Sequence, residues 1–451
     1  MPVKLGNTNI SKLYLGDTEV QKLYLGDVLI YLNQDTTSFI TTWRTTTSSE
    51  TITIPTNSLL TYNYNITTSD GQSFSGITGD KTITFATAGD YDVSINIDNG
   101  GTFPSIYFNN TGDKDKIIDI KQWGAIVWSS FNSSFHGCSN LTGSYTDVAN
   151  TVNVTDMRSM FTDATSFNSA LTFDTSNVIE MSSMFKGASS FNQPLSFDTG
   201  NVGTMFRMFN GASSFNSALT FNTGNVTTMA SMFNGASSFN QPLNFDTSSV
   251  TGVNSMFQFA TSFNQPLNFD TSNVTNMSFM FYGATSFNSS LTFTDTSSVT
   301  SMYGMFRDAS SFNQPLNNWD TSNVTNMSSM FRDATSFNQP LNNWDTSNVT
   351  DMSFMFDNAA SFDQSLNWNI STVTNMLSMF VNITLSTTNY DAILIYWENE
   401  LQTAFPNGVG YTPTISITFG GSQYTGGGTA ATARASLINN FNWTIIDGGI
   451  V

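Results

Sequence analysis

The stretch FNQPLNNWDTSNVTNMSSMFRDATS, Phe312–Ser336, is the clearest copy of the unit that decides the fold. The same unit recurs with a period of 24 or 25, and the dipeptide Met-Phe marks its register in ten copies, from Met160-Phe161 to Met379-Phe380. A degenerate eleventh copy precedes them at residues 134–141. A period of this length is typical of a solenoid, in which each repeat buries its apolar face against its neighbours. We therefore predict a solenoid of about eleven coils over residues 117–382.

A single copy, Phe263–Phe287, predicts a short strand followed by a short helix. Leu267 and Phe269 alternate with polar residues, and this alternation predicts a strand that points both side chains inward. The apolar residues between positions 274 and 281 are spaced as one face of a helix. We expect the aromatic and methionine columns of all copies to form the core.

An asparagine follows the closing phenylalanine of most copies. Stacked at the strand spacing of about 4.8 Å, such amides are suited to bonding the backbone of the neighbouring coil. We interpret this column as structural. Its members are Asn168, Asn192, Asn216, Asn240, Asn264, Asn288, Asn313 and Asn338.

A column of aspartates occupies one position of the repeat, with Asn222 interrupting it. Capping of a turn is our first interpretation, because a carboxylate accepts backbone N–H bonds at such a place. A row of calcium sites is the second, although calcium needs six to eight oxygens and each copy offers about one carboxylate. A carboxylate pair for glycoside hydrolysis is remote, since identical carboxylates lack the differing environments of an acid and a nucleophile. The aspartates are Asp174, Asp198, Asp246, Asp270, Asp320 and Asp345.

The outward position of the predicted strand carries a hydroxyl or an amide in every copy. We predict that this column forms a polar strip about 40 Å long, which either binds a polymer such as a glycan or is a plain solvated face. The residues that we assign to the ligand face are Asn244, Asn268, Thr292, Asn317, Asn342 and Asn367. Lys186, Arg307 and Arg332 share a second position, directly after Met-Phe, and serve either local charge balance or a partner contact.

Three segments flank the repeats. Residues 1–32 repeat with a period of ten as short strands joined by Gly-Asp or Gly-Asn turns, and we predict a docking segment, with Leu13, Tyr14, Leu23, Tyr24 and Ile30 as its anchor. Residues 33–116 alternate with period 2 in several short runs, which predicts an immunoglobulin-like β-sandwich. Residues 383–451 predict an α+β cap, with a helix buried on its Tyr390, Ile393, Leu394, Trp397 and Leu401 face and capped by Ser or Thr, a strand at 415–419, and a helix near 430–440.

Composition excludes several classes of function. The net charge of −19 argues against nucleic acid and anionic membranes as partners. One cysteine and one histidine leave no disulfide, no thiolate metal site and little acid–base chemistry, so we expect no cofactor, no metal and no enzymatic activity. The first residues carry no run of the signal-peptide type, and no stretch approaches about 20 apolar residues. We expect neither membrane insertion nor export by that route.

The repeat resembles a known family. The pattern Phe-Asn-Gln-Pro-Leu-x-x-Trp-Asp-Thr-Ser-Asn-Val-Thr-x-Met-x-x-Met-Phe is similar to the surface-protein repeat of mycoplasma, of the bacterial-surface-antigen class of leucine-rich repeats. Residues 135–141 are similar to the treponemal variant, and the tail with Arg434 and Asp447 resembles the usual ending of such proteins. This resemblance implies a leucine-rich-repeat-type solenoid and surface adhesion to host or matrix molecules.

The front of the chain resembles a different class. The segment Lys-Leu-Tyr-Leu-Gly-Asp-Thr-Glu-Val, residues 12–20, is similar to N-terminal segments of phage tail and head-appendage proteins. We therefore predict a phage virion protein, a fibre or decoration at the virion surface, anchored to other virion proteins by residues 1–32 and binding a host glycan or protein through its solenoid. A bacterial cell-surface adhesin is the alternative, a glycan-degrading enzyme is the remote one, and self-association into a homo-oligomer stays open.

Overall fold

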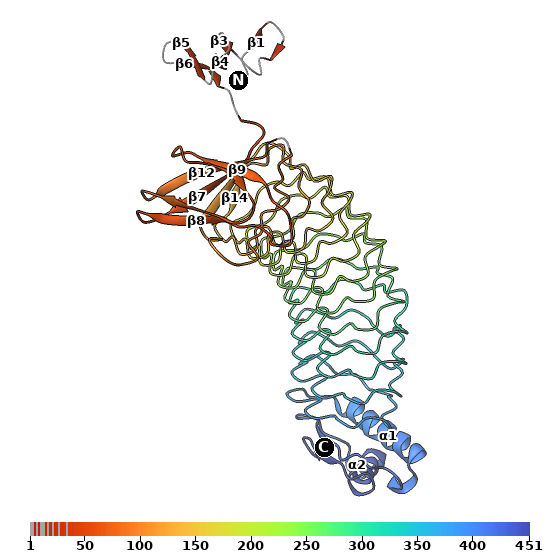
Figure 1. Cartoon of the computed structure of the whole chain (residues 1–451). Helices are drawn as coiled ribbons and strands as arrows, with labels where there is room; N and C mark the ends of the chain where they lie inside the picture. Colours follow the sequence, from red (N-terminus) through yellow and green to blue (C-terminus); the bar gives the residue numbers. More distant parts are fainter. Residues whose placement is uncertain are drawn as a thin grey trace.

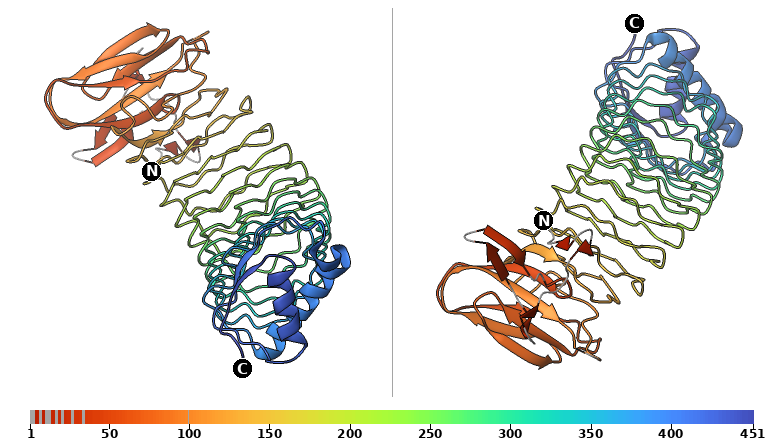
Figure 2. Two further views of the ribbon diagram at one scale, coloured as in Figure 1. Left: turned by 90° about the horizontal axis from the view of Figure 1, so that it is seen from below. Right: turned by 90° about the horizontal axis from the view of Figure 1, so that it is seen from above.

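The computed structural model describes residues 35–98 and 100–451, together with the backbone of six short strands that precede residue 33. In this part of the chain the fold is mainly β, with open sheets and two α-helices near the C-terminus. Figures 1 and 2 show an elongated molecule, in which a stack of coils separates the sheets that begin at residue 39 from the C-terminal helices. The prediction of a mainly β chain with few helices is confirmed.

Residues 1–32 contain three antiparallel pairs of strands, which follow the period of ten in the sequence. The pairs are β1 (Lys4–Leu5) with β2 (Thr8–Asn9), β3 (Tyr14–Leu15) with β4 (Thr18–Glu19), and β5 (Lys22–Leu25) with β6 (Val28–Leu32). Among the predicted anchor residues, Leu13 and the side chains of Tyr14, Leu23, Tyr24 and Ile30 lie outside the described residues.

Two sheets pack against each other beyond residue 38. The larger has the order β10-β9-β12-β7-β13-β14, and the smaller pairs β11 with β8. Their core includes Phe39, Trp43, Phe85, Phe103 and Trp123, all buried. The strands are β7 (Phe39–Thr45), β8 (Glu50–Ile54), β9 (Tyr64–Thr68), β10 (Ser73–Ile77), β11 (Lys81–Phe85), β12 (Gly89–Asn96), β13 (Ile117–Gln122) and β14 (Thr142–Gly143).

The larger sheet leads directly into the coils. β13 runs antiparallel to β7 on one side and pairs in parallel with β14 on the other. From there, parallel bridges join residues one repeat apart, as in Thr204 to Thr228 and Thr228 to Gly252. The predicted boundary at residue 116 therefore falls at the start of β13, a strand that belongs to the sheet and also begins the stack.

The predicted helix within each repeat is wrong, because the segment around Met-Phe forms turns that bond to the next coil. In one coil the N–H groups of Met229, Ser231, Phe233 and Gly235 donate to carbonyls of the following coil at 2.7–3.0 Å. The intervening N–H groups of Met232, Asn234 and Ala236 donate to carbonyls three residues back. Ser231 and Gly235 adopt the left-handed conformation, with φ of 56° and 71°, and thereby interrupt a helix.

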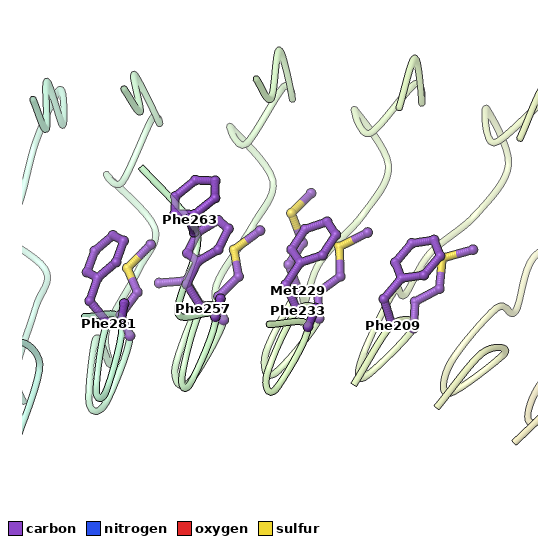
Figure 3. Packing of buried hydrophobic residues seen from close by; sticks show 14 of the residues in the cluster. Phe209, Met229, Phe233, Phe257, Phe263 and Phe281 are labelled. Carbon is purple, nitrogen blue, oxygen red and sulfur yellow. The ribbon is translucent and has the colours of Figure 1, made fainter. Parts of the chain in front are cut away.

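The apolar columns form the core, as predicted. Phe257 stacks on Phe233 at 5.7 Å, on Phe281 at 5.6 Å and on Phe263 at 4.1 Å between ring centroids (Figure 3). The methionine columns are buried with these rings. Leu267 points inward as predicted, but its strand is reduced to a single bridge to Leu291. Each coil thus buries its apolar face against its two neighbours.

Helices and short strands cover the last coil. They are α1 (Thr387–Ala404), the short 3-10 helix Pro406–Gly408, β15 (Ser416–Thr418), α2 (Thr429–Asn439) and β16 (Thr444–Ile446). The buried face of α1 is the predicted one, and Phe419 stacks on Phe380 of the last coil at 4.9 Å. Ser386 is the N-cap residue as predicted, but its hydroxyl donates to Asp363 at 2.9 Å and accepts no bond from the helix N–H groups. Neither α1 nor any other helix of the described residues has the length and apolarity that crossing a bilayer requires.

Three side chains join the ends of this C-terminal segment. Asp447 is almost completely buried and accepts hydrogen bonds from the Tyr390 hydroxyl at 2.6 Å and from Arg434 Nε at 2.7 Å. Arg434 also lies over the ring of Tyr424. The residues that resembled a typical ending therefore fasten β16 to α1 and α2.

Candidate binding surface

The predicted ligand face lies on one side of the stack, with one residue in each coil. Asn244, Asn268, Thr292, Asn342 and Asn367 are exposed, while Asn317 is half-buried. Four of them lie between a buried leucine and a buried phenylalanine or tryptophan, which explains why they point outward, while Asn317 and Asn342 are each the first of two asparagines between these buried residues. The structure therefore brings the six residues together as one row.

Part of this row is engaged in holding coils together. Asn317 Oδ1 accepts a bond from the Asn343 backbone at 2.9 Å, and Asn342 Oδ1 accepts one from the Asn367 backbone at 3.3 Å. Thr292 Oγ1 donates to the Leu267 carbonyl at 3.3 Å. The side chains of Asn244 and Asn268 make no hydrogen bond within the described residues, so their donors and acceptors face solvent.

The asparagines that follow the closing phenylalanines form a ladder, as predicted. Asn240 Oδ1 accepts bonds from the Asn264 backbone at 2.9 Å and from Gln265 Nε2 at 3.1 Å. The same backbone bond, at 2.8–2.9 Å, joins every pair of neighbouring coils from Asn168 to Asp363. The column is structural.

The aspartate column caps turns, which confirms the first interpretation. Asp174 Oδ1 accepts the Ser176 backbone N–H at 3.0 Å, and the same bond recurs in other copies, as from Ser322 to Asp320. Hydrogen bonds from the backbone and the hydroxyl of Ser176 lower the pKa of Asp174. No group of three residues of the metal-ligating types is gathered anywhere in the described ranges.

Two of the three basic residues that follow Met-Phe, Arg307 and Arg332, lie beside carboxylates. Arg307 Nε lies 3.5 Å from Asp308, and Arg332 Nε lies 3.4 Å from Asp333 and 3.3 Å from Asp357. Both arginines thus face carboxylates of their own coil or the next one. Burial raises the pKa of Asp308 and of Asp357 despite these guanidinium groups.

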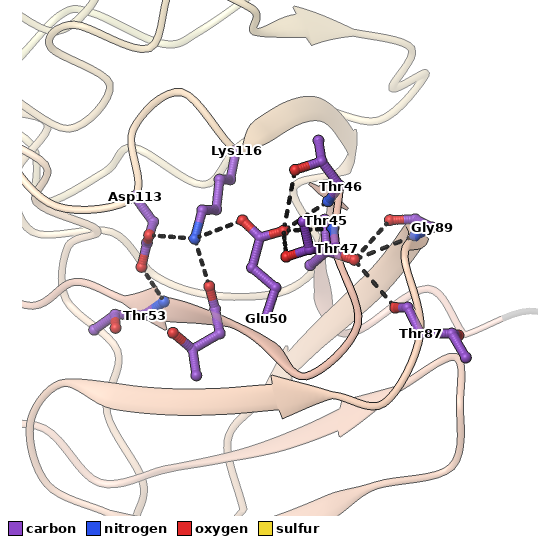
Figure 4. A network of polar contacts seen from close by, with 10 residues as sticks. Thr45, Thr46, Thr47, Glu50, Thr53, Thr87, Gly89, Asp113 and Lys116 are labelled. Atoms are coloured by element: carbon purple, nitrogen blue, oxygen red, sulfur yellow. Dashed lines mark hydrogen bonds and ion pairs between the residues drawn. The ribbon is translucent and has the colours of Figure 1, made fainter.

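A polar cavity of about 640 Å³ opens where the sheets meet the first coils. Its lining includes Arg44, Glu50, Lys116, Asp119 and Thr142. Lys116 Nζ bonds the Thr51 carbonyl at 2.6 Å, Asp113 at 2.9 Å and Glu50 at 3.1 Å (Figure 4). Because its three donors are all occupied, Lys116 fastens the start of β8 to the start of β13.

Glu50 is the acceptor at the centre of this network. Its carboxylate accepts the backbone N–H of Thr46 at 2.6 Å and of Thr47 at 3.1 Å (Figure 4). The bonds from the Thr46 backbone, from Lys116 and from the Thr47 backbone lower the pKa of Glu50 to about 2.

Burial shifts the pKa of the single cysteine and of the single histidine of the chain. Cys138 is fully buried, and burial raises the pKa of its thiol. Burial also lowers the pKa of His136, whose Nε2 lies 3.9 Å from Asp163. Both residues belong to the packing of the first coil.

The roles of two sets of residues were not predicted from the sequence. The first is a buried threonine column, in which Thr199 Oγ1 donates to the Asn222 carbonyl of the next coil at 2.9 Å. The recurring Asp-Thr-Ser-Asn tetrapeptide is the sequence signal for this column, because its threonine recurs as regularly as its aspartate. The second set consists of the aromatic residues that flank Met-Phe in a few copies, such as Phe259 and Tyr282, which replace the small or polar residues of other copies.

Comparison with known proteins gives one match. The family model described as "Mycoplasma protein of unknown function, DUF285" matches residues 129–220, 217–294 and 289–393. Together these matches run from residue 129 to residue 393, which is more than half of the chain. No curated protein and no solved structure matches the chain. The matched segments coincide with the coils and their periodic columns, and the chain therefore belongs to the DUF285 family of Mycoplasma-type repeat proteins.

Proposed function

We propose that this chain is a non-enzymatic structural protein of a phage virion, a fibre or decoration at the virion surface. Residues 1–32 anchor it to other virion proteins, and the coil stack binds the host surface. In the same proposal, residues 33–116 are an immunoglobulin-like sandwich, residues 117–382 a leucine-rich-repeat-type solenoid of about eleven coils, and residues 383–451 an α+β cap.

The regularity of the stack supports the solenoid part of this proposal. Successive coils share the asparagine ladder and the parallel bridges, with bonds repeated at the same positions. Each coil packs mainly on its two neighbours, which is the arrangement of repeat proteins. The sheets at one end and the helices at the other cover the terminal coils, as an open solenoid requires.

One observation carries the binding function: the outward row stays polar and uncharged in successive coils. Asn244 and Asn268 are exposed and contribute no bond to the described stack, so stability does not require an amide there. A row of amides and hydroxyls at the coil spacing of about 4.8 Å offers regularly placed donors and acceptors. This arrangement suits a partner that is itself extended.

The anchoring function rests on residues 1–32. Their resemblance to phage appendage segments motivates it, and the three antiparallel pairs follow the same period of ten. Such short pairs of strands make a poor independent core, so this segment gains stability by packing on a partner.

Mass spectrometry of particles purified from a lysate tests the proposal. We expect the full chain in the particles, and we expect a chain lacking residues 1–32 to be absent from them although its coils still fold. Circular dichroism of the purified truncated chain provides the folding control. Absence of the full chain from the particles would sink the virion assignment, and incorporation of the truncated chain would move the anchor elsewhere.

A bacterial cell-surface adhesin is the second candidate, and the family description, which names proteins of a bacterium, supports a cellular protein over a virion protein without naming a function. The two candidates differ in where the protein resides. Protease treatment of intact cells removes a surface adhesin before lysis, whereas a virion protein is released only with particles.

A further inference from the structure

Four aromatic side chains gather at the Met-Phe edge of the stack, away from the polar row. Phe259 packs against Tyr282 of the next coil, with ring centroids 4.7 Å apart. Phe279 contacts Tyr282 at 5.6 Å and Tyr303 of the following coil at 4.7 Å. The four rings form a continuous group over three adjacent coils, which we name the aromatic patch.

The aromatic patch is partly open to solvent. Phe259 is 44% exposed, and the other three rings are half-buried. By contrast, the phenylalanines of Met-Phe, such as Phe257 and Phe281, are completely buried (Figure 3). The aromatic patch therefore belongs to the surface and is not an extension of the core.

The backbone holds two of these rings in an unusual conformation. Phe259 and Phe279 have φ of 56° and 60°, a left-handed conformation that bulky residues rarely adopt. The neighbouring coils carry Gly235 and Gly283 at the position of Phe259, and Ser255 and Gly304 at the position of Phe279. Other coils are left-handed at the same two positions, as at Ser255 and Gly235, so the stack imposes this conformation and these two coils place an aromatic ring on it.

Two glycines make room for these rings. A Cβ atom on Gly283 would collide with the Phe259 ring, and one on Gly304 would lie 2.8 Å from a ring carbon of Phe279. Each phenylalanine therefore rests along the surface of the next coil and does not project from it.

Charged groups border the aromatic patch on its C-terminal side. The Arg307 guanidinium lies over the Tyr282 ring, 5.0 Å from its centroid, and is paired with Asp308. Arg332, Asp333 and Asp357 continue this border in the next two coils. The site thus combines a few aromatic faces with donors and acceptors at one edge, which is the composition of a small-ligand site and not of a purely apolar contact.

We propose that the aromatic patch binds sugar rings of a host-surface glycan, with Phe259, its most exposed ring, stacking on a pyranose face and Arg307 and Asp308, beside Tyr282, bonding hydroxyl groups. This inference rests on the proposed host-binding function and names the site and the ligand class. The C–H groups of a pyranose face carry the partial positive charge that suits the negative face of an aromatic ring.

The size of the site favours a glycan over a protein. An aromatic side chain presents roughly 200 Å², so four partly buried rings expose less than about 400 Å². A stable protein interface needs about 800 Å² from each partner. The aromatic patch spans three coils, or about 10 Å, which fits a short run of sugar units.

The chain supplies its own test variants. Phe259→Gly and Tyr282→Asn introduce the residues that a preceding coil carries at these positions, Gly235 and Asn234, so the double variant keeps the fold. Phe206→Ser is the matched control, because Phe206 occupies the position of Tyr303 but lies in a distant coil beside Arg207. Thermal unfolding monitored by circular dichroism verifies that all variants are folded.

The binding of the full-length protein and its variants is measured first on a glycan array of bacterial and animal oligosaccharides, then by calorimetry with the best oligosaccharide. Binding by the unchanged protein that weakens roughly tenfold or more in the double variant, and not in Phe206→Ser, supports the proposal. Adsorption to intact cells, with and without periodate oxidation of their glycans, is measured in parallel.

Three outcomes overturn the proposal. The first outcome is that the protein adsorbs to cells but binds no glycan, or that its adsorption survives periodate and is lost after protease. The ligand is then a protein. Equal affinity of the double variant, with loss of binding on Asn244→Arg and Asn268→Arg, places the glycan on the polar row. Failure of the unchanged protein to adsorb to any cell contradicts the proposed host-binding function itself and not only this site.

Discussion

The side chain of Asn240 illustrates how a single residue position closes each coil. Its Oδ1 accepts two bonds from the following coil, while its own backbone N–H donates to Asn216 of the preceding coil at 2.9 Å. An unpaired N–H at a partly buried place costs free energy comparable to a lost hydrogen bond. The amide therefore stabilises the junction of three coils.

Asn240→Ala tests this role at the residue scale. Because the Asn264 N–H loses its acceptor and the Gln265 amide keeps only the Asn240 carbonyl, at 3.2 Å, we expect a loss of about 1–3 kcal/mol in the free energy of unfolding. Denaturation with guanidinium chloride, followed by circular dichroism, measures it. Asn244→Ala, on the exposed row of the same coil, is the matched control and should change the free energy by less than about 0.5 kcal/mol. Equal effects of the two substitutions would remove the distinction between ladder and row.

The asparagine ladder and the aspartate caps could be predicted because each depends on one residue type at a fixed position of the period. The left-handed residues before Met-Phe could not be predicted in this way. Ser231, Arg207 and Phe279 all adopt positive φ at the same position, although none of them favours that conformation. Bonds to the neighbouring coil impose it, and the partners in those bonds lie a full repeat away in the sequence.

At the scale of the element, the same bonds explain why the predicted helix is absent. Between residues 226 and 233 the buried side chains Val226, Met229 and Phe233 have helical spacing, and a helix would bury them too. The stack requires alternate N–H groups to face the next coil, however, and a helix would use all of them internally. The tertiary demand for inter-coil bonds overrides the local preference.

The connection between β7 and β8 gives a pH-dependent prediction at this scale. The folded state lowers the pKa of Glu50 from 4.5 to about 2, so its stabilising contribution is present above about pH 4.5 and is lost as the pH falls through 2. In Glu50→Gln we expect a lower thermal midpoint than in the unchanged protein near pH 6, and a difference that shrinks toward pH 2. Thermal unfolding at several pH values checks this. A difference that stays constant over the range would contradict the role of the ionised carboxylate.

At the scale of the whole molecule, the elements that cover the first and last coils determine whether the stack stays folded. The buried face of α1 could be predicted from its periodicity, and Trp397 on that face packs near Phe380 of the last coil. The bond between Tyr390 and Asp447 joins residues 57 positions apart, and no local pattern announces it. The sequence therefore predicts the helices and strands of the C-terminal end, while the side-chain bonds that hold them together are visible only in the folded structure.

Asp447→Asn tests this fastening. The substitution removes the charge that Arg434 faces and weakens the hydrogen bond from Tyr390. We therefore expect the free energy of unfolding to fall by roughly 2–4 kcal/mol, a range already lowered for the partial exposure of Arg434. Hydrogen exchange of α2 and β16 should rise before that of the central coils. Asp391→Asn, which affects only the more exposed bonds to Thr425, is the control and should leave the exchange of α2 nearly unchanged. Uniformly faster exchange in all coils would show that this end does not unfold separately.

The repeated junction between coils also has a consequence for how such a gene changes over time. Every junction uses the same donors and acceptors, as the bonds from the Asn240 backbone to Asn216 and from the Asn264 backbone to Asn240 show. Duplication or loss of one repeat by recombination between copies therefore yields a chain whose new junction resembles the old ones. Such events lengthen or shorten the molecule in steps of about 4.8 Å and shift the spacing between its two ends without redesigning either. Recombination alone can thus change the length of the molecule, while point substitutions change its faces independently.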